Sequence, residues 1–207
     1  KHSPRNLWST TVTDQLRLAT NFQAKVIGVS LKDRASILPA GHNTNGAFWY
    51  DDTSGNFVTS SYYMNELPKW VQQFNQQDLP TKINAKERNT LLPIQQYTES
   101  SPDNSSWEGL LGSAKTPTFP YNNLAQDFQK KKGEIRATPF GSTLTLKLAE
   151  ASITGEQLGQ DNITDFLAIN IASTDYAGHK FGPNSIEVED VYLRLDRDLK
   201  DFFNHLD

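Results

Sequence analysis

The hydrophobic pattern of the chain is clearest in two short runs that do not alternate with polar residues. One run has six apolar residues between Phe166 and Ala172, and the other extends from Val26 to Leu31. Apolar runs of this length are typical of strands covered on both faces, as in a parallel α/β sheet. We therefore predict that Lys25–Leu31 and Phe166–Ser173 are parallel, neighbouring strands of one sheet, and that Phe166–Ser173 is a central strand.

Apolar residues at helical spacing predict several helices around these strands. Leu7, Val12, Leu16 and Ala19 indicate a short amphipathic helix, in which Thr11-x-x-Asp14 resembles a capping box. A short helical turn over residues 35–41 ends at Gly41. Leu67, Trp70, Val71 and Phe74 form an aromatic stripe that we interpret as core.

Two longer helices are predicted in the last third of the chain. One helix is predicted over residues 142–158, and we interpret Ser142 as its N-terminal cap. Residues 185–206 follow a capping signal at Asn184 and Ser185, with Glu187 close behind. These helices are expected to pack on the faces of the sheet, because helices cover both faces of parallel sheets. The predicted fold class is α/β, with three layers and a mostly parallel sheet.

The middle of the chain follows a weaker pattern. Gly46–Tyr50 and Asn56–Ser60 are β-prone segments on either side of a turn sequence, which predicts a hairpin. From about residue 76 to 139, prolines interrupt a polar stretch with isolated aromatic residues, so we expect short elements packed over the core. We assign 1–44 and 140–207 to the α/β core and 45–139 to an inserted, cap-like segment.

The composition of the chain excludes some kinds of site and makes some classes of function unexpected. The chain has 207 residues, a formal net charge of −4 and no cysteine, which excludes disulfides and thiolate metal sites. Without a long basic run, a nucleic-acid surface is not expected, although a small anionic substrate needs only a local pair of cations. No apolar run has the length of a membrane span, and no signal peptide precedes Lys1. The missing initiator Met suggests a fragment or a processed chain.

Asp175 and His179 directly follow the predicted central strand. Ligands of open α/β sheets bind beyond the carboxyl ends of the strands, where these two side chains would lie. Gly178 argues against a helix here, so we expect a loop that folds back on itself. A carboxylate and a neutral imidazole suit zinc. The alternative is a turn that Asp175 caps, with His179 simply exposed.

Lys32 and Arg34 follow the other buried strand. If the chain stays extended, residues two apart point the same way, so these cations would project together from the strand end. Such a pair suits a dianionic group, which Arg contacts in bidentate fashion and Lys as a point charge. The alternative is a solvated charged turn. His42 lies within reach of the same edge, but we interpret it as structural.

Together these residues resemble the alkaline phosphatase superfamily, and within its type I phosphodiesterase/nucleotide pyrophosphatase group the PafA-type bacterial alkaline phosphatases. The resemblance covers both ends of the chain and is weakest between about 76 and 139. Its motifs are Ser3-Pro-x-Asn-Leu, Ser9-Thr-Thr, Asp14-Gln-Leu, Lys25-Val-Ile-Gly, Leu31-Lys-Asp-Arg34, Ile37-Leu-Pro-Ala-Gly-His42, Tyr63-Met64, Leu67-Pro68, Trp70-Val71, Asp175-Tyr-x-Gly-His-Lys-Phe-Gly-Pro-Asn-Ser-Ile-Glu-Val-Glu-Asp190 and Tyr192-Leu-Arg-Leu-Asp-Arg-Asp198.

The resemblance implies a phosphate monoesterase with two zinc ions and a phosphorylated Thr intermediate. By this resemblance Asp175 and His179 ligate one zinc, and Lys32 and Arg34 bind the phosphoryl oxygens. Zinc and two cations would neutralise the charge on a monoester dianion. If both strand ends point the same way, all four residues converge on one edge of the sheet. The family also implies a periplasmic or secreted location.

The resemblance also shows what the chain lacks. The family's nucleophile, the carboxylate before it, a phosphate-binding Asn and the remaining metal ligands have no match here. We therefore expect a segment of a phosphatase, completed by flanking segments and inactive when isolated. Two alternatives stay open. One is a phosphodiesterase of the same superfamily, which the two cations disfavour because a diester carries one charge fewer. The other is an α/β module without activity.

Overall fold

The fold was analysed in a computed structural model that describes residues 2–84 and 87–207. Its internal contacts divide the chain into two compact units. The first contains Lys1–Asp51, Asn56–Gln77 and Thr145–Ile171, and the second contains Asp52–Gly55, Asp78–Leu144 and Ala172–Asp207. Each unit gathers segments that are distant in the sequence, so each is described by itself.

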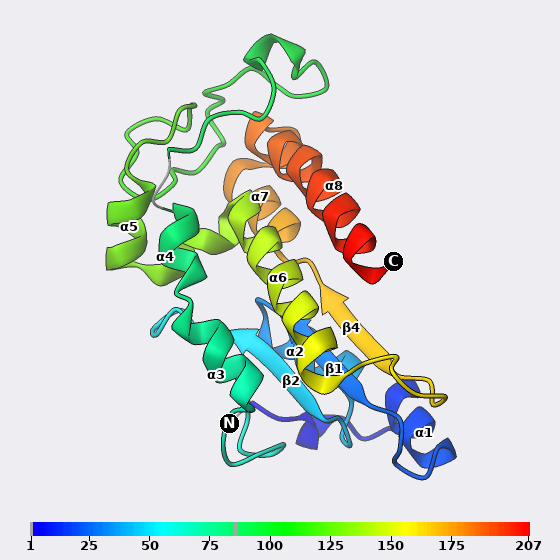
Figure 1. Ribbon diagram of the computed structural model, residues 1–207. Helices are drawn as coiled ribbons and strands as arrows, with labels where there is room; N and C mark the ends of the chain where they lie inside the picture. Colours follow the sequence, from blue (N-terminus) through cyan, green and yellow to red (C-terminus); the bar gives the residue numbers. More distant parts are fainter. Residues whose placement is uncertain (1, 85–86) are drawn as a thin grey trace. The chain divides into compact units, whose positions relative to one another are not determined.

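The first unit is built on a four-stranded sheet with the order β3-β2-β1-β4 (Figure 1). The strands are β1 (Val26–Ser30), β2 (Gly46–Tyr50), β3 (Phe57–Val58) and β4 (Phe166–Asn170). β1 is parallel to both β2 and β4, and β3 is antiparallel to β2. The prediction that the two apolar runs are parallel neighbours is confirmed, and so is the hairpin.

Two details of the sequence prediction need correction. Within the described residues β4 is an edge strand rather than a central one, and its side chains are only partly buried, with Phe166 37% exposed. An apolar run predicts a strand but does not report how many strands pair with it. In addition, β2 and β3 belong to the core sheet, because β2 pairs with β1. The predicted insertion that starts at residue 45 therefore includes part of the core.

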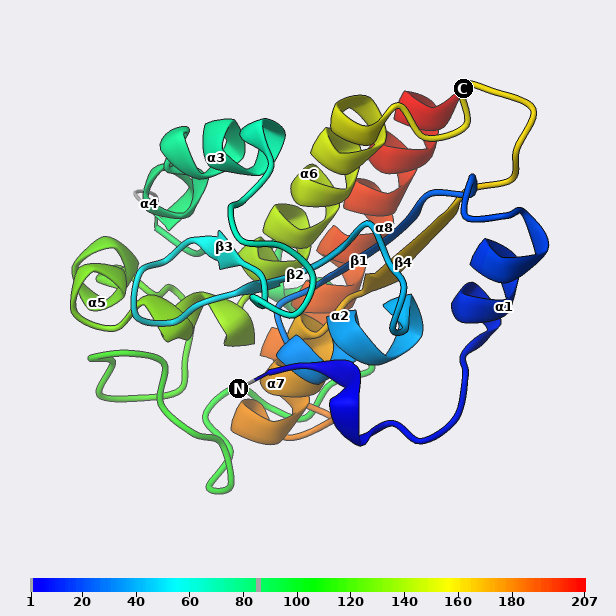
Figure 2. The same ribbon diagram turned by 90° about the horizontal axis from the view of Figure 1, so that it is seen from below.

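Helices cover both faces of this sheet, which confirms the three-layer α/β class (Figure 2). On one face lies α2 (Asp33–Ala40), which approaches β1 so closely that a Cβ on Gly28 would lie 2.4 Å from the Ser36 carbonyl oxygen. On the other face lie α3 (Lys69–Gln76) and part of α6 (Pro139–Glu156), where Trp70 contacts Phe48 edge to face.

The predicted start of the first helix is confirmed in α1 (Val12–Ala19), which has a complete capping box between Thr11 and Asp14. Its predicted apolar face is only partly buried: Leu16 packs against a core cluster, whereas Val12 is 71% exposed. The polar residues Thr13 and Asp14 are buried instead. The starts of two other helices also differ from the prediction. α2 begins at Asp33 rather than Ala35, and α6 begins at Pro139, so Ser142 lies inside the helix and is not its cap.

The second unit is helical, with α7 (Ser173–Phe181) and α8 (Ile186–Leu206) as its main elements. The predicted short elements between residues 76 and 139 are α4 (Leu79–Asn84), η2 (Ile94–Gln96), α5 (Leu124–Lys130) and the 3-10 helix η3 (Lys132–Ala137); a further 3-10 helix, η1 (Pro4–Asn6), lies in the first unit. Leu111, Tyr121 and Leu124 pack in one core cluster with residues of α7 and α8. The middle segment therefore builds the core of this unit.

A buried polar cluster lies beside that apolar core. Arg88 is 1% exposed and forms an ion pair with Asp190 at 3.7 Å, while Tyr97 donates a hydrogen bond to Asp190 at 2.8 Å. Tyr121 donates to the buried carboxylate of Glu187. These contacts tie α8 to residues 88–121. In the described part of the chain, no helix combines the length and apolar character needed to span a bilayer.

Candidate active site

Asp175 and His179 lie on a helix, not in the loop that the sequence predicted. α7 runs from Ser173 to Phe181 and continues through Gly178. Glycine inside a helix costs roughly 1 kcal/mol relative to alanine, which the packing of neighbouring residues easily offsets. Ala177 and Phe181 on the same helix are fully buried in the core cluster. That tertiary packing explains why the helix persists across the glycine.

The helix brings the predicted metal ligands together. Residues four apart lie on the same helical face, and the His179 Nε2 is 3.4 Å from an Asp175 carboxylate oxygen. The His179 side chain is 81% exposed and that of Asp175 is 50% exposed, so both are accessible from solvent. Asp175 lies in the first turn of α7, whose N-cap is Ala172.

The donor set on α7 fits a metal ion such as zinc, which accepts carboxylate oxygen and imidazole nitrogen. Zinc sites in proteins normally use three or four protein ligands. In the described ranges, no group of three or more His, Cys, Asp or Glu side chains is arranged to hold a metal. The predicted pair would supply two donors, so a full site would require at least one more ligand.

Lys32 and Arg34 lie at the start of a helix rather than on an extended strand. β1 ends at Ser30, Lys32 is the N-cap of α2, and Arg34 is the second residue of that helix. The expectation of an alternating, extended backbone is therefore wrong here. The helical alternative is equally suitable for phosphate, because the amino end of a helix carries a partial positive charge and free N–H groups. No hydrogen bond from the Lys32 side chain caps α2.

The surroundings of the two cations are polar. Arg34 is exposed and Lys32 is half-buried. Asp33, between them, lies 2.6 Å from the His2 ring nitrogen Nδ1. The last residues of β1 and β4 are held side by side by a hydrogen bond from the Ser30 hydroxyl to Asn170 at 2.9 Å. Lys32 and Arg34 belong to the first compact unit, and Asp175 and His179 belong to the second. Convergence of all four residues stays a prediction.

His42 is held in a structural network of the first unit. Its Nδ1 lies 2.8 Å from the Asp14 carboxylate and its Nε2 lies 3.0 Å from the Leu7 carbonyl oxygen. The hydrogen bond to Asp14 raises the pKa of His42. Burial alone would raise the pKa of Asp14, but the hydrogen bonds from His42, Thr11 and Asn43 hold it well below its usual value. This network supports the structural interpretation of His42.

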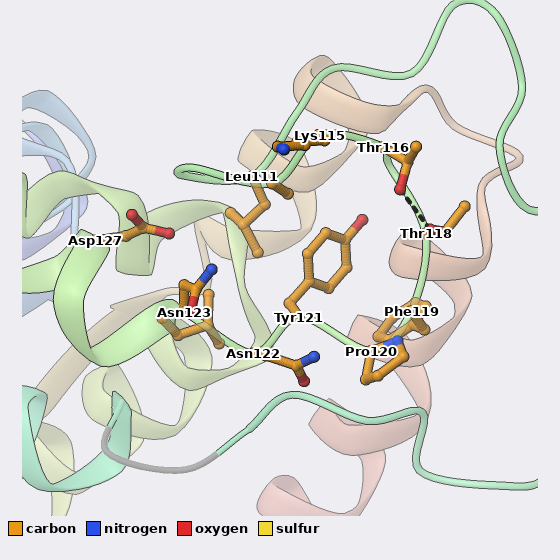
Figure 3. Close-up of a pocket in the computed structure, with 12 residues that line it drawn as sticks. Leu111, Lys115, Thr116, Thr118, Phe119, Pro120, Tyr121, Asn122, Asn123 and Asp127 are labelled. Atoms are coloured by element: carbon orange, nitrogen blue, oxygen red, sulfur yellow. Dashed lines mark hydrogen bonds between the residues drawn. The ribbon is translucent and has the colours of Figure 1, made fainter.

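A small cavity of about 200 Å³ opens in the second unit, between Leu111 and Asp127 (Figure 3). Tyr121 lines it together with polar side chains such as Asn122, Asn123 and Thr116. It contains none of the four predicted site residues. The same holds for a cavity of about 280 Å³ beside His42 in the first unit. The candidate site is thus an exposed surface of the chain rather than either of these two cavities.

Sequence reasoning missed a group of residues that hold α7 from one side. Arg136 of η3 donates a hydrogen bond to the Tyr176 hydroxyl at 2.6 Å, and Lys180 forms an ion pair with Glu134 at 2.6 Å. Glu134 and Arg136 lie in the stretch with the weakest pattern. Their partners, residues 176 and 180, are four apart and lie on one face of α7. This shared face could be predicted only if α7 itself had been predicted.

The fold and these residues define a class of protein. The family of type I phosphodiesterases/nucleotide pyrophosphatases matches residues 4–207, and the chain belongs to this family. This agrees with the resemblance described from the motifs.

Two relatives and one crystal structure narrow the comparison. Over its full length the chain is 72% identical to alkaline phosphatase PafA of Elizabethkingia meningoseptica, and over 99% of its length it is 55% identical to alkaline phosphatase PhoV of Synechococcus elongatus. A crystal structure of a PafA variant with one Thr, one Asn, one Lys and one Arg substituted covers the whole chain with a TM-score of 0.98 and 71% identity. The chain spans 38% of the PafA length, 37% of the PhoV length and 40% of that crystallised chain.

Proposed function

We propose that this chain is part of a zinc-dependent alkaline phosphatase that hydrolyses phosphate monoesters. The observation that carries the proposal is the exposed carboxylate–imidazole pair of Asp175 and His179 on one face of α7, with 3.4 Å between His179 Nε2 and a carboxylate oxygen. The high identity to two relatives named alkaline phosphatase supports it. Both the activity and the substrate class belong to the longer protein that carries this chain.

The two pairs of candidate residues bind different groups in this proposal. Asp175 and His179 would hold a zinc ion, which needs at least one further ligand. When bound, zinc lowers the pKa of a coordinated water or alcohol and stabilises negative charge on oxygen. Lys32 and Arg34 bind the nonbridging phosphoryl oxygens, with Arg34 in bidentate contact and Lys32 as a compact charge.

The PafA variant supports the assignment of the two cations. Its name gives a substituted Lys and a substituted Arg that are two positions apart. In this chain Lys-x-Arg occurs at Lys32–Arg34 and again at Lys86–Arg88. Arg88 is fully buried and paired with Asp190, whereas Arg34 is exposed at the start of a helix. A phosphate from solvent is therefore expected at the first pair.

Phosphodiester hydrolysis is the second candidate, because the family name includes it. A monoester dianion carries one more charge than a diester, so the second cation contributes more to monoester turnover.

The test is Arg34→Ala in the full-length protein. Loss of a charge-assisted bidentate contact is worth roughly 1.5–3 kcal/mol, so kcat/KM for an aryl phosphate monoester should fall about ten- to a hundredfold. The loss for the matching aryl methyl diester should be several times smaller. Arg197→Ala, which removes an exposed arginine of α8, is the matched control. An equal or larger loss with the diester would favour the phosphodiesterase.

A further inference from the structure

The three sides of α7 have three different environments, all within the second unit. Ser173, Ala177 and Phe181 are buried and form one stripe, since they are spaced four apart. Asp175 and His179 form a second, exposed stripe. Tyr176 and Lys180 form a third stripe, which faces η3. The buried stripe sets which side of the helix faces the core, and contacts of the third stripe add a second constraint on its rotation.

Two polar contacts from η3 hold the third stripe. Arg136 donates from Nη1 to the Tyr176 hydroxyl at 2.6 Å, and its guanidinium also lies 5.3 Å from the centre of the Tyr176 ring. Lys180 donates to Glu134 at 2.6 Å, and both side chains are mostly buried, with exposures of 25% and 11%. Residues 176 and 180 each lie next to a proposed metal ligand in sequence.

The residues of η3 that make these contacts are themselves anchored. Arg136 forms an ion pair with Asp52 at 2.7 Å, and Glu134 also pairs with Lys131 at 2.8 Å. Ile135, between them, is 1% exposed. The Lys180 backbone carbonyl accepts a hydrogen bond from Gly109 at 2.7 Å, which fixes the same turn of α7 from another segment.

We infer that Glu134 and Arg136 are positioning residues for the metal site, which set the rotation of α7 so that Asp175 and His179 both point at one ion. This inference rests on the proposed function. Residues that orient metal ligands typically change affinity ten- to a hundredfold when they are altered, because a small rotation moves a donor out of bonding distance.

Electrostatics alone and loss of positioning predict opposite changes in zinc affinity when Lys180 is replaced, which makes the inference testable. Lys180→Met removes a positive charge beside His179, so charge effects alone would strengthen zinc binding. Loss of positioning would weaken it. Tyr176→Phe removes only a hydroxyl and leaves the charge unchanged, so it reports positioning without any electrostatic change.

The experiment measures zinc affinity of the full-length protein by competition with a chromophoric chelator, and the visible absorption spectrum after Co²⁺ substitution. Lys180→Met and Tyr176→Phe should each weaken zinc binding about tenfold and alter the Co²⁺ spectrum. Lys180→Arg keeps the ion pair and should bind within about twofold of the unaltered protein. Lys200→Met is the matched control, because it removes the same charge from an exposed lysine of α8.

Three results would overturn the inference. If Lys180→Met binds zinc more tightly while Tyr176→Phe is unchanged, charge and not orientation governs the site. If Lys200→Met weakens binding as much as Lys180→Met, the effect does not pass through α7. The double variant Asp175→Ala/His179→Ala serves as the reference, and unchanged zinc affinity in it would refute the proposed metal site itself. If the double variant loses zinc affinity but Lys180→Met and Tyr176→Phe do not, only the positioning role is refuted.

Discussion

At the scale of single residues, hydrogen-bond partners decide which protonation state of a side chain is stabilised. His42 illustrates this, because its two ring nitrogens face only acceptors, the Asp14 carboxylate and the Leu7 carbonyl oxygen. Both nitrogens can donate only when the imidazole is protonated. The arrangement therefore stabilises the charged form, in agreement with the raised pKa of His42.

A pH dependence of stability follows from this network. The pKa of His42 is raised on folding, so its contribution is complete below about pH 6.5 and is lost as pH rises through the folded pKa. The pKa of Asp14 is lowered on folding, so its contribution is present above about pH 4 and is lost as pH falls further. His42→Gln should therefore cost about 1–2 kcal/mol at pH 5.5 and distinctly less at pH 8.5.

Urea unfolding of both proteins at the two pH values measures this difference. A cost that stays the same or grows at pH 8.5 would contradict the protonated imidazole.

At the scale of elements, the sequence predicted strands and helices well and predicted their ends less well. The apolar run of β1 and the capping box of α1 depend on neighbouring residues, and both were found where expected. The loop predicted across Gly178 was wrong, because Ala177 and Phe181 are held by contacts with distant segments that local propensity does not include. For the same reason the start of α2 at Asp33 was missed, and with it the geometry of Lys32 and Arg34.

Two glycines allow these packing arguments to be tested as a pair. A Cβ at Gly178 would meet no atom within 4 Å, so Gly178→Ala should stabilise α7 by about 0.5–1 kcal/mol. A Cβ at Gly28 would lie 2.4 Å from the Ser36 carbonyl oxygen, so Gly28→Ala should destabilise the protein by roughly 1–3 kcal/mol. Chemical denaturation measures both changes, and destabilisation by Gly178→Ala would show that α7 needs the glycine.

For the whole molecule, the sequence indicated the class of fold and the four candidate residues. It could not indicate the division into two compact units, because this division follows from contacts between segments such as residues 88–121 and α8. Nor could it reveal that η3 holds α7, since ion pairs between distant residues leave no periodic pattern. Asp175 and His179 could be proposed as metal ligands from the sequence, whereas the contacts of Glu134 and Arg136 with α7 could not be foreseen.

The central claim is that Asp175 and His179 ligate a zinc ion required for phosphate monoester hydrolysis. The most direct measurement is the zinc content of the full-length protein by elemental analysis, taken together with turnover of an aryl phosphate, before and after both residues are changed to alanine. We predict the loss of one zinc per molecule and a fall in kcat/KM of roughly a hundredfold or more. Unchanged zinc content with unchanged turnover would contradict the claim.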